Sequence, residues 1–136
     1  MRIGLVVSEF NRELTKKMED EAIEFAQKKN IKIIKKVLVP GAYDMPLVVQ
    51  KLAEIKEIDA VVCLGAIVKG QTEHDRVIAQ ALAKTLQELS LNTKKPILFG
   101  IIGPGASYEK AKKRVQEYAI RAMEAAIKMK NTIEKI

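Results

Sequence analysis

Hydrophobic residues recur along the chain in two alternating patterns. In the first, short runs rich in Val, Ile and Leu are apolar at nearly every position, which is typical of strands buried on both faces of a sheet. In the second, apolar residues return every three or four positions, as on one face of an amphipathic helix. The first pattern predicts strands at residues 3–8, 31–39, 60–64 and 96–101, and the second predicts helices at about 12–29, 46–55, 73–91 and 107–130.

This alternation predicts one α/β domain over residues 1–136. Repeated strand–helix units imply a parallel sheet with helices on both faces and right-handed crossovers. We expect a three-layer α/β/α sandwich with a flavodoxin-like four-stranded parallel sheet in the order 2-1-3-4. The lysines of residues 31–39 place that strand at an edge, because charge there discourages unwanted pairing. Ligands of such sheets bind beyond the carboxyl ends of the strands, so the loops that follow the strands are the expected location of a site.

The composition is that of a globular protein and excludes several other classes. Hydrophobic residues make up 48% and charged residues 30% of the 136 positions, a balance unlike that of disordered or fibrous chains. One cysteine, Cys63, excludes a disulfide framework and a cysteine-based zinc site, and one histidine excludes a histidine metal cluster. The longest apolar run, residues 60–68, is far shorter than the roughly 20 residues that span a bilayer. Because the N-terminus also has no signal-peptide pattern, we expect a cytoplasmic protein without metal or membrane.

The net charge of +7 raises the question of a nucleic-acid partner. Most lysines alternate with glutamates along the predicted helices, which is typical of a solvated surface. Three Tyr, three Phe and no Trp are too few for a platform on which bases stack. The charge therefore favours anionic small molecules, such as phosphate esters, over nucleic acid.

The loop after the third strand carries the most informative chemistry. Gly70, Gln71 and Thr72 precede a helix, whose free N–H groups and dipole form a ready phosphate site. Thr72 is a candidate N-cap, with Asp75 three residues later. His74 lies in the first turn, where an imidazole beside a phosphate ester suits proton transfer. The alternative is that Thr72 only caps the helix and His74 is a surface residue.

The other loops each allow a functional and a purely structural interpretation. Phe10 follows a buried strand in a polar setting, so it either stacks on a planar ligand or folds back into the core. Asp44 either holds ligand hydroxyls or caps the helix that follows it. The segment 103–105 (GPG) either cradles an anion or simply turns the chain, since it does not match a dinucleotide-binding fingerprint.

Two arginines of the last predicted helix share a face. Arg114 and Arg121 are seven residues apart, and Glu124 is within reach of an ion pair with Arg121. Spacing alone favours a solvated charged face over a binding role for these residues.

Four segments of the chain resemble the motifs of one enzyme family in order. They are SEFN, VPGAYDMPLVVQKLA, DAVVCLGAIVKGQTEHD and KPILFGII, and the third keeps the spacing of its glycines, threonine and histidine. These motifs resemble those of the 6,7-dimethyl-8-ribityllumazine synthase family, a family of transferases in riboflavin biosynthesis, over essentially the whole chain. The resemblance implies condensation of 5-amino-6-(D-ribitylamino)uracil with 3,4-dihydroxy-2-butanone 4-phosphate to the lumazine, with release of phosphate and water and no cofactor.

The resemblance also implies roles for individual residues. Phe10 would stack on the pyrimidine of ribitylaminouracil. The other residues implied to bind that substrate are Ala42, Tyr43, Asp44, Ala66, Ile67, Val68 and Phe99. The residues implied to bind the phosphate are Gln71, Thr72 and Arg114, whereas His74 would transfer protons. Phe99 and Arg114 would come from a neighbouring subunit, because the family's sites lie between subunits of a pentamer. For this chain the resemblance leaves two assemblies open, a pentamer and a sixty-subunit shell of pentamers.

The sequence departs from the common family pattern in ways that look archaeal. Asp44 stands where a glutamate is common, and GPGAS replaces a different fourth loop. Arg121 stands near a lysine that many relatives pair with a glutamate, here Glu124. Two rival functions are an archaeal-type riboflavin synthase, against which the GQTEH motif argues, and a non-catalytic flavin- or lumazine-binding oligomer.

Overall fold

A computed structural model describes residues 1–70 and 73–136. Strands and helices alternate along the chain as the hydrophobic pattern predicts. The strands are β1 (Arg2–Ser8), β2 (Lys32–Val39), β3 (Ala60–Ala66) and β4 (Ile97–Ile102). The helices are α1 (Arg12–Lys28), the 3-10 helix η1 (Ala42–Asp44), α2 (Met45–Ala53), α3 (His74–Thr93), α4 (Tyr108–Lys112) and α5 (Val115–Glu134).

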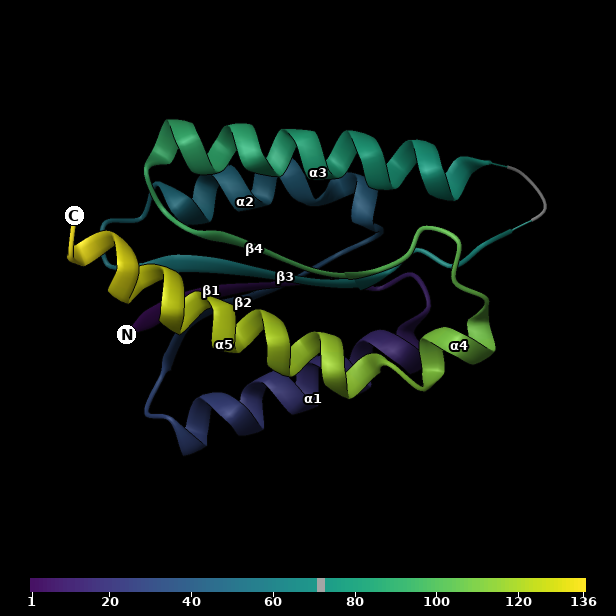
Figure 1. The fold of residues 1–136 in the computed structure, drawn as a ribbon, viewed down its shortest axis with the longest axis horizontal. Helices are drawn as coiled ribbons and strands as arrows, with labels where there is room; N and C mark the ends of the chain where they lie inside the picture. Colours follow the sequence, from purple (N-terminus) through teal and green to yellow (C-terminus); the bar gives the residue numbers. More distant parts are fainter. Residues whose placement is uncertain (71–72) are drawn as a thin grey trace.

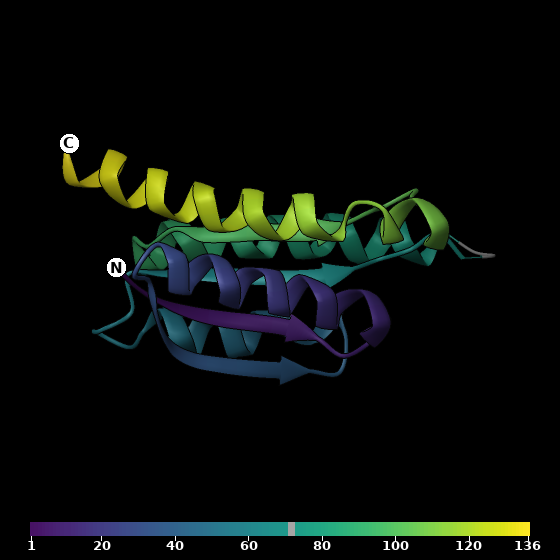
Figure 2. The same cartoon turned by 90° about the horizontal axis from the view of Figure 1, so that it is seen from below.

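The four strands form one parallel sheet in the order β2-β1-β3-β4, which confirms the predicted order. The sheet lies between two layers of helices, with α2 and α3 on one face and α1 and α5 on the other (Figures 1 and 2). Both chain termini lie at one end of the molecule, and the carboxyl end of β3 and the start of α3 lie at the opposite end (Figure 1). That opposite end is where the carboxyl ends of the strands meet.

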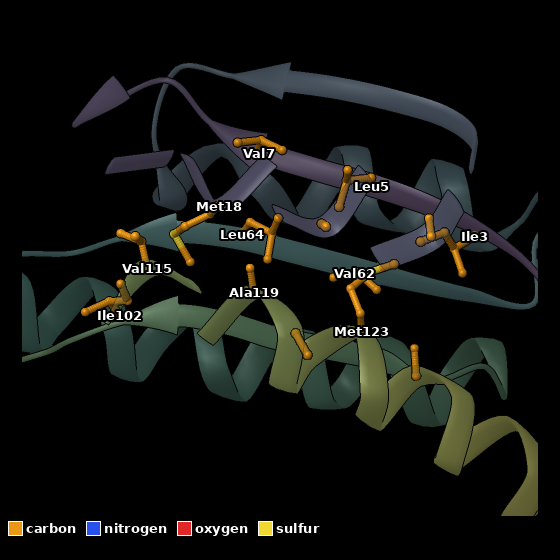
Figure 3. Packing of buried hydrophobic residues seen from close by; sticks show 14 of the residues in the cluster. Ile3, Leu5, Val7, Met18, Val62, Leu64, Ile102, Val115, Ala119 and Met123 are labelled. Atoms are coloured by element: carbon orange, nitrogen blue, oxygen red, sulfur yellow. The ribbon is translucent and has the colours of Figure 1, made fainter. Parts of the chain in front are cut away.

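The hydrophobic core has one layer on each face of the sheet. Between the sheet and helices α1 and α5, the residues of β1, β3 and α5 interlock, including Leu64, Ala119 and Met123 (Figure 3). The second layer packs α2 and α3 on the other face of the same strands. Cys63 belongs to this second layer, and burial raises the pKa of its thiol to about 12, so it is a core residue rather than a nucleophile.

The predicted helix at 107–130 is in fact two helices that meet at Lys113 and Arg114. The N–H groups of these two residues donate to carbonyls three residues back, at Lys110 and Ala111, so the backbone tightens there and restarts as α5. The apolar spacing continues across this break, so periodicity alone does not reveal it. Met129 has the helical spacing of the buried Ala119 and Ala126 but is 42% exposed, because the end of α5 extends beyond the packed part of the sheet.

No helix within the described residues is long and apolar enough to cross a membrane. Residues 1–70 and 73–136 also bring together no group of His, Cys, Asp and Glu side chains that would hold a metal ion.

Candidate functional site

A cavity of about 330 Å³ opens at the carboxyl ends of the strands. Its walls come from the loops after β1, β2 and β3 and from the first turns of α3, which is where the fold predicts a ligand. The predicted residues that line it are Phe10, Ala42, Tyr43, Ala66, Ile67, Val68 and His74. The mixture of apolar walls and a few polar groups is typical of a site for a small ring-containing molecule.

Two aromatic side chains stand at this cavity with unusually large exposure. Phe10 is 69% and Tyr43 is 72% exposed, so neither folds back into the core. Phe10 is held by its backbone, which donates to the Pro40 carbonyl at 3.0 Å and so joins the first loop to the second. Aromatic rings held at the mouth of a cavity are suited to stacking on a planar ligand.

Asn11 fixes the first loop and was not singled out from the sequence. Its backbone is left-handed, with φ 61°, a conformation that asparagine tolerates better than most residues. Its side-chain Nδ2 donates to the carbonyl oxygen of Ala66 at 3.0 Å, across 55 positions of sequence. Asn11 therefore turns the chain immediately after Phe10 and ties the loop to the wall of the cavity.

The Asp44 carboxylate closes the short turn in which it lies. Its Oδ2 atom accepts a hydrogen bond from the backbone N–H of Gly41 at 3.0 Å, which closes the η1 turn. Asp44 lines a neighbouring hollow between α2 and α3, next to Tyr43, rather than the cavity itself. Asp44 occupies the N-cap position of α2 but makes no side-chain hydrogen bond to that helix, so the expectation that it caps the following helix is wrong. A contact with ligand hydroxyls stays a prediction.

His74 is the first residue of α3, and its side chain is exposed at the cavity. The N-cap position is Glu73, which makes no side-chain cap, so α3 begins one residue later than a Thr72 cap predicts. The Asp75 carboxylate accepts a hydrogen bond from the Gly105 N–H, and its expected pairing with Thr72 falls outside the described residues. Gln71 and Thr72, the predicted phosphate-binding residues, lie outside the described residues.

The loop after β4 (the fourth loop, residues 103–107) lies directly against the loop after β3 (the third loop). The N–H of Ile67 donates to the Ile102 carbonyl, and that of Lys69 donates to the Ala106 carbonyl, both at 2.7 Å. Gly103 has φ +105°, and a Cβ atom there would lie only 2.1 Å from the carbonyl oxygen of Ile67. Close approach of the two loops therefore depends on glycine at position 103.

Gly103→Ala is expected to destabilise the protein by about 2–3 kcal/mol, because it adds overpacking against Ile67 to backbone strain. Gly105→Ala is the matched control: φ is +87°, but a Cβ there meets no atom of residues 1–70 or 73–136 within 4 Å. It should cost about 1 kcal/mol from strain alone. Urea unfolding of both variants measures the difference, and equal losses would show that the close approach of the two loops contributes nothing.

Arg114 and Arg121 converge on one carboxylate of α5. Arg114 Nε lies 2.7 Å from Glu117 Oε2, and its Nη2 lies 3.1 Å from Oε1, which is a bidentate pair. Arg121 Nη2 donates to the same Oε1 at 2.6 Å. Both guanidinium groups also lie near the ring of Tyr118, at 5.5 and 5.8 Å from its centre. The hydrogen bond from Arg114 holds the pKa of Glu117 below its usual value, although burial acts the other way.

The predicted ion pair between Arg121 and Glu124 is therefore wrong, because Arg121 pairs with a different glutamate. Arg121 pairs with Glu117, one turn back, which already holds Arg114. Glu124 lines the same shallow hollow of α5 as Arg121. Neither Arg114 nor Phe99 is among the residues that line the cavity, and the Phe99 side chain is 39% exposed on β4.

The chain is similar to known proteins over nearly its whole length. Residues 1–134 match the family described as 6,7-dimethyl-8-ribityllumazine synthase. The 6,7-dimethyl-8-ribityllumazine synthase of Methanopyrus kandleri is 48% identical over 136 residues, covering 100% of this chain and 96% of the relative. The one of Saccharolobus islandicus (strain L.S.2.15 / Lassen #1) is 46% identical, covering 100% and 88%. That of Metallosphaera sedula is 46% identical over 129 residues, covering 95% and 85%.

Proposed function

The chain belongs to the 6,7-dimethyl-8-ribityllumazine synthase family, enzymes of riboflavin biosynthesis, and we propose that it joins 5-amino-6-(D-ribitylamino)uracil to 3,4-dihydroxy-2-butanone 4-phosphate. The observation that carries this proposal is the cavity in which Phe10, the backbone at 66–68 and His74 meet. A flat pyrimidine would stack on Phe10 and present its ring edge to the backbone of the third loop. No metal or cofactor is needed for the reaction.

In the proposed mechanism, the 5-amino nitrogen attacks the ketone, and the adduct loses water to form an imine. The carbon beside the imine then loses a proton while the bond to phosphate breaks, which gives an enol that rearranges to a ketone. The ribitylamino nitrogen attacks this ketone and closes the second ring with loss of another water. His74, at the cavity, would carry protons between the nitrogen and oxygen atoms that gain and lose them. Holding both substrates in one cavity removes much of the entropic cost of bringing them together.

We assign the phosphate of the second substrate to Gln71, Thr72 and Arg114, with Arg114 supplied by a neighbouring copy of the chain. Arg114 and Phe99 do not line the cavity of their own chain, which is why the proposal needs a second copy. Exposed apolar side chains around the site give such a copy a surface to cover: Leu47 is 64% and Val77 is 63% exposed. Glu117 would present Arg114 by holding two of its nitrogens and leaving Nη1 for a phosphate oxygen.

Arg114→Ala is expected to raise the KM for the phosphate substrate by about 10-fold with a smaller change in kcat, since a charge-assisted contact is lost. Arg114→Lys should recover only part of that loss, because an ammonium group lacks the planar fork. Steady-state kinetics in each substrate measures this. An unchanged KM would place the phosphate clamp elsewhere.

Subunit mixing tests where Arg114 comes from. When His74→Ala and Arg114→Ala chains are co-expressed, random assembly would give about a quarter of the shared sites both native residues. Activity at low phosphate substrate should then exceed that of either variant alone. Activity no higher than the mean of the two variants would contradict a site built from two chains.

A further inference from the structure

The loop after β4 binds a carboxylate of the protein itself, the side chain of Asp75. The backbone N–H of Gly105 donates to the Oδ2 atom of Asp75 at 2.9 Å, across 30 positions of sequence. Asp75 is only 6% exposed, although it is charged and lies next to His74, which is exposed. A carboxylate removed from water needs a hydrogen-bond donor, so losing the Gly105 N–H contact would lower the stability of the folded state.

The position of Asp75 connects two parts of the site. It is the second residue of α3 and lines the cavity together with His74. In the first turn of a helix, the dipole favours a carboxylate. Side chains of adjacent helical residues point about 100° apart, so Asp75 faces inward while His74 faces the solvent side of the cavity.

Two other contacts of the fourth loop go to the loop after β3. The Ala106 carbonyl accepts from Lys69, and Gly103 packs against Ile67, so both attach this loop to the third loop. Asp75 adds an attachment to α3 itself. Its hydrogen bond thus links the turn that carries His74 to a loop that is already fixed to the cavity wall.

We propose that Asp75 is a positioning residue: by binding the Gly105 N–H, it fixes the first turn of α3 and so the location of His74 relative to the cavity. The proposal rests on the function proposed for His74. Asp75 acts through His74 and the fourth loop and is assigned no contact with the substrates.

Two variants separate the hydrogen bond from the charge. Asp75→Ala removes the acceptor, whereas Asp75→Asn keeps a side-chain carbonyl oxygen that accepts from Gly105 without the charge. Asp20→Ala is the matched control, because it deletes an exposed carboxylate from α1, which packs on the other face of the sheet. Each protein is assayed for kcat and KM with both substrates, and for the hydrogen-exchange rate of the Gly105 amide.

In Asp75→Ala, we expect kcat to fall by about 10-fold with KM changed less than about 3-fold, since bound substrates meet a misplaced His74. The Gly105 amide should exchange at least about 10-fold faster, because its acceptor is gone. Asp75→Asn should remain within about 3-fold of the native kcat and keep slow exchange. Asp20→Ala should match the native protein in both measurements.

Two outcomes would overturn the proposal. Native kcat and native Gly105 exchange in Asp75→Ala would show that the link positions nothing, and equal losses of kcat in Asp75→Ala and Asp75→Asn would assign the effect to charge. Failure of the proposed function is distinct, since the native protein itself would then form no product. The exchange of Gly105 would still decide whether Asp75 holds the fourth loop.

Discussion

His74→Ala is expected to lower kcat by about 100-fold, the contribution typical of one general acid–base group. His74 is the ionisable side chain of the cavity that the proposed mechanism uses for proton transfer, and alanine leaves water to take its place. Steady-state kcat with both substrates saturating measures the loss. Because the side chain is exposed at the start of α3, its removal should leave the fold intact.

The control for His74 is in the same helical turn. Arg76 is exposed and pairs with Glu73 at the surface, so Arg76→Ala should leave the free energy of unfolding within about 1 kcal/mol of the native value.

A fluorescence titration with ribitylaminouracil alone should give similar affinity for the native protein and His74→Ala. Native kcat in His74→Ala would remove the histidine from the mechanism.

Glu19→Ala is expected to lower the free energy of unfolding by about 3–5 kcal/mol, the cost typical of breaking a buried ionic cluster. The Glu19 side chain is 1% exposed and lies between α1 and β2. Its oxygens are 2.9 Å from Arg12 Nη2, 3.1 Å from Lys36 Nζ and 3.3 Å from Lys16 Nζ. Without the carboxylate, these three cations face one another at the edge strand.

Glu24→Ala is the matched control for Glu19 on the same helix. Glu24 pairs with Lys28 at 3.0 Å, but both side chains are more than half exposed, so the loss should be about 0–1 kcal/mol. Urea unfolding at neutral pH measures both variants. Equal losses in the two would mean that the buried cluster contributes no more than a surface pair.

The same cluster gives stability a pH dependence with a definite sign. Burial raises the pKa of Glu19, but hydrogen bonds from Arg12, Lys36 and Lys16 outweigh it and hold the pKa below its ordinary value of 4.5. The folded state therefore binds the Glu19 proton less tightly than the unfolded state does, so the contribution is present above about pH 4.5 and lost as the pH falls through the folded pKa. Acid unfolding of the native protein should be steeper than that of Glu19→Ala, and parallel curves would contradict this.

The sequence predicts the arrangement of the sheet well, for a physical reason. Continuous apolar runs identify the strands, their alternation with helices favours a parallel flavodoxin-like sheet, and the lysines of the second run mark β2 as an edge strand. The break at Lys113 and Arg114 escapes prediction, because the residues on both sides keep one helical spacing. The break results from the hydrogen bonds of the Lys113 and Arg114 N–H groups to carbonyls three residues back, which the spacing of apolar residues does not reveal.

The sequence predicts which residues reach the candidate site, because this depends on their position after the strands. It does not predict which residues their side chains contact. Phe10, Tyr43 and His74 follow strands, so the fold brings them to one cavity. The contacts of Asn11 and Asp75 join segments far apart in sequence, and no local pattern indicates them. Acidic residues stand on both sides of Arg121 in α5, and only the structure shows which one it contacts.

Product formation by the purified protein tests the account most directly. The protein is mixed with 5-amino-6-(D-ribitylamino)uracil and 3,4-dihydroxy-2-butanone 4-phosphate, and fluorescence of the lumazine is followed beside a protein-free reaction. The account predicts lumazine formation above background that needs both substrates, releases one phosphate per product and falls in His74→Ala. Background rates with folded protein, or conversion of lumazine alone to riboflavin, would contradict it.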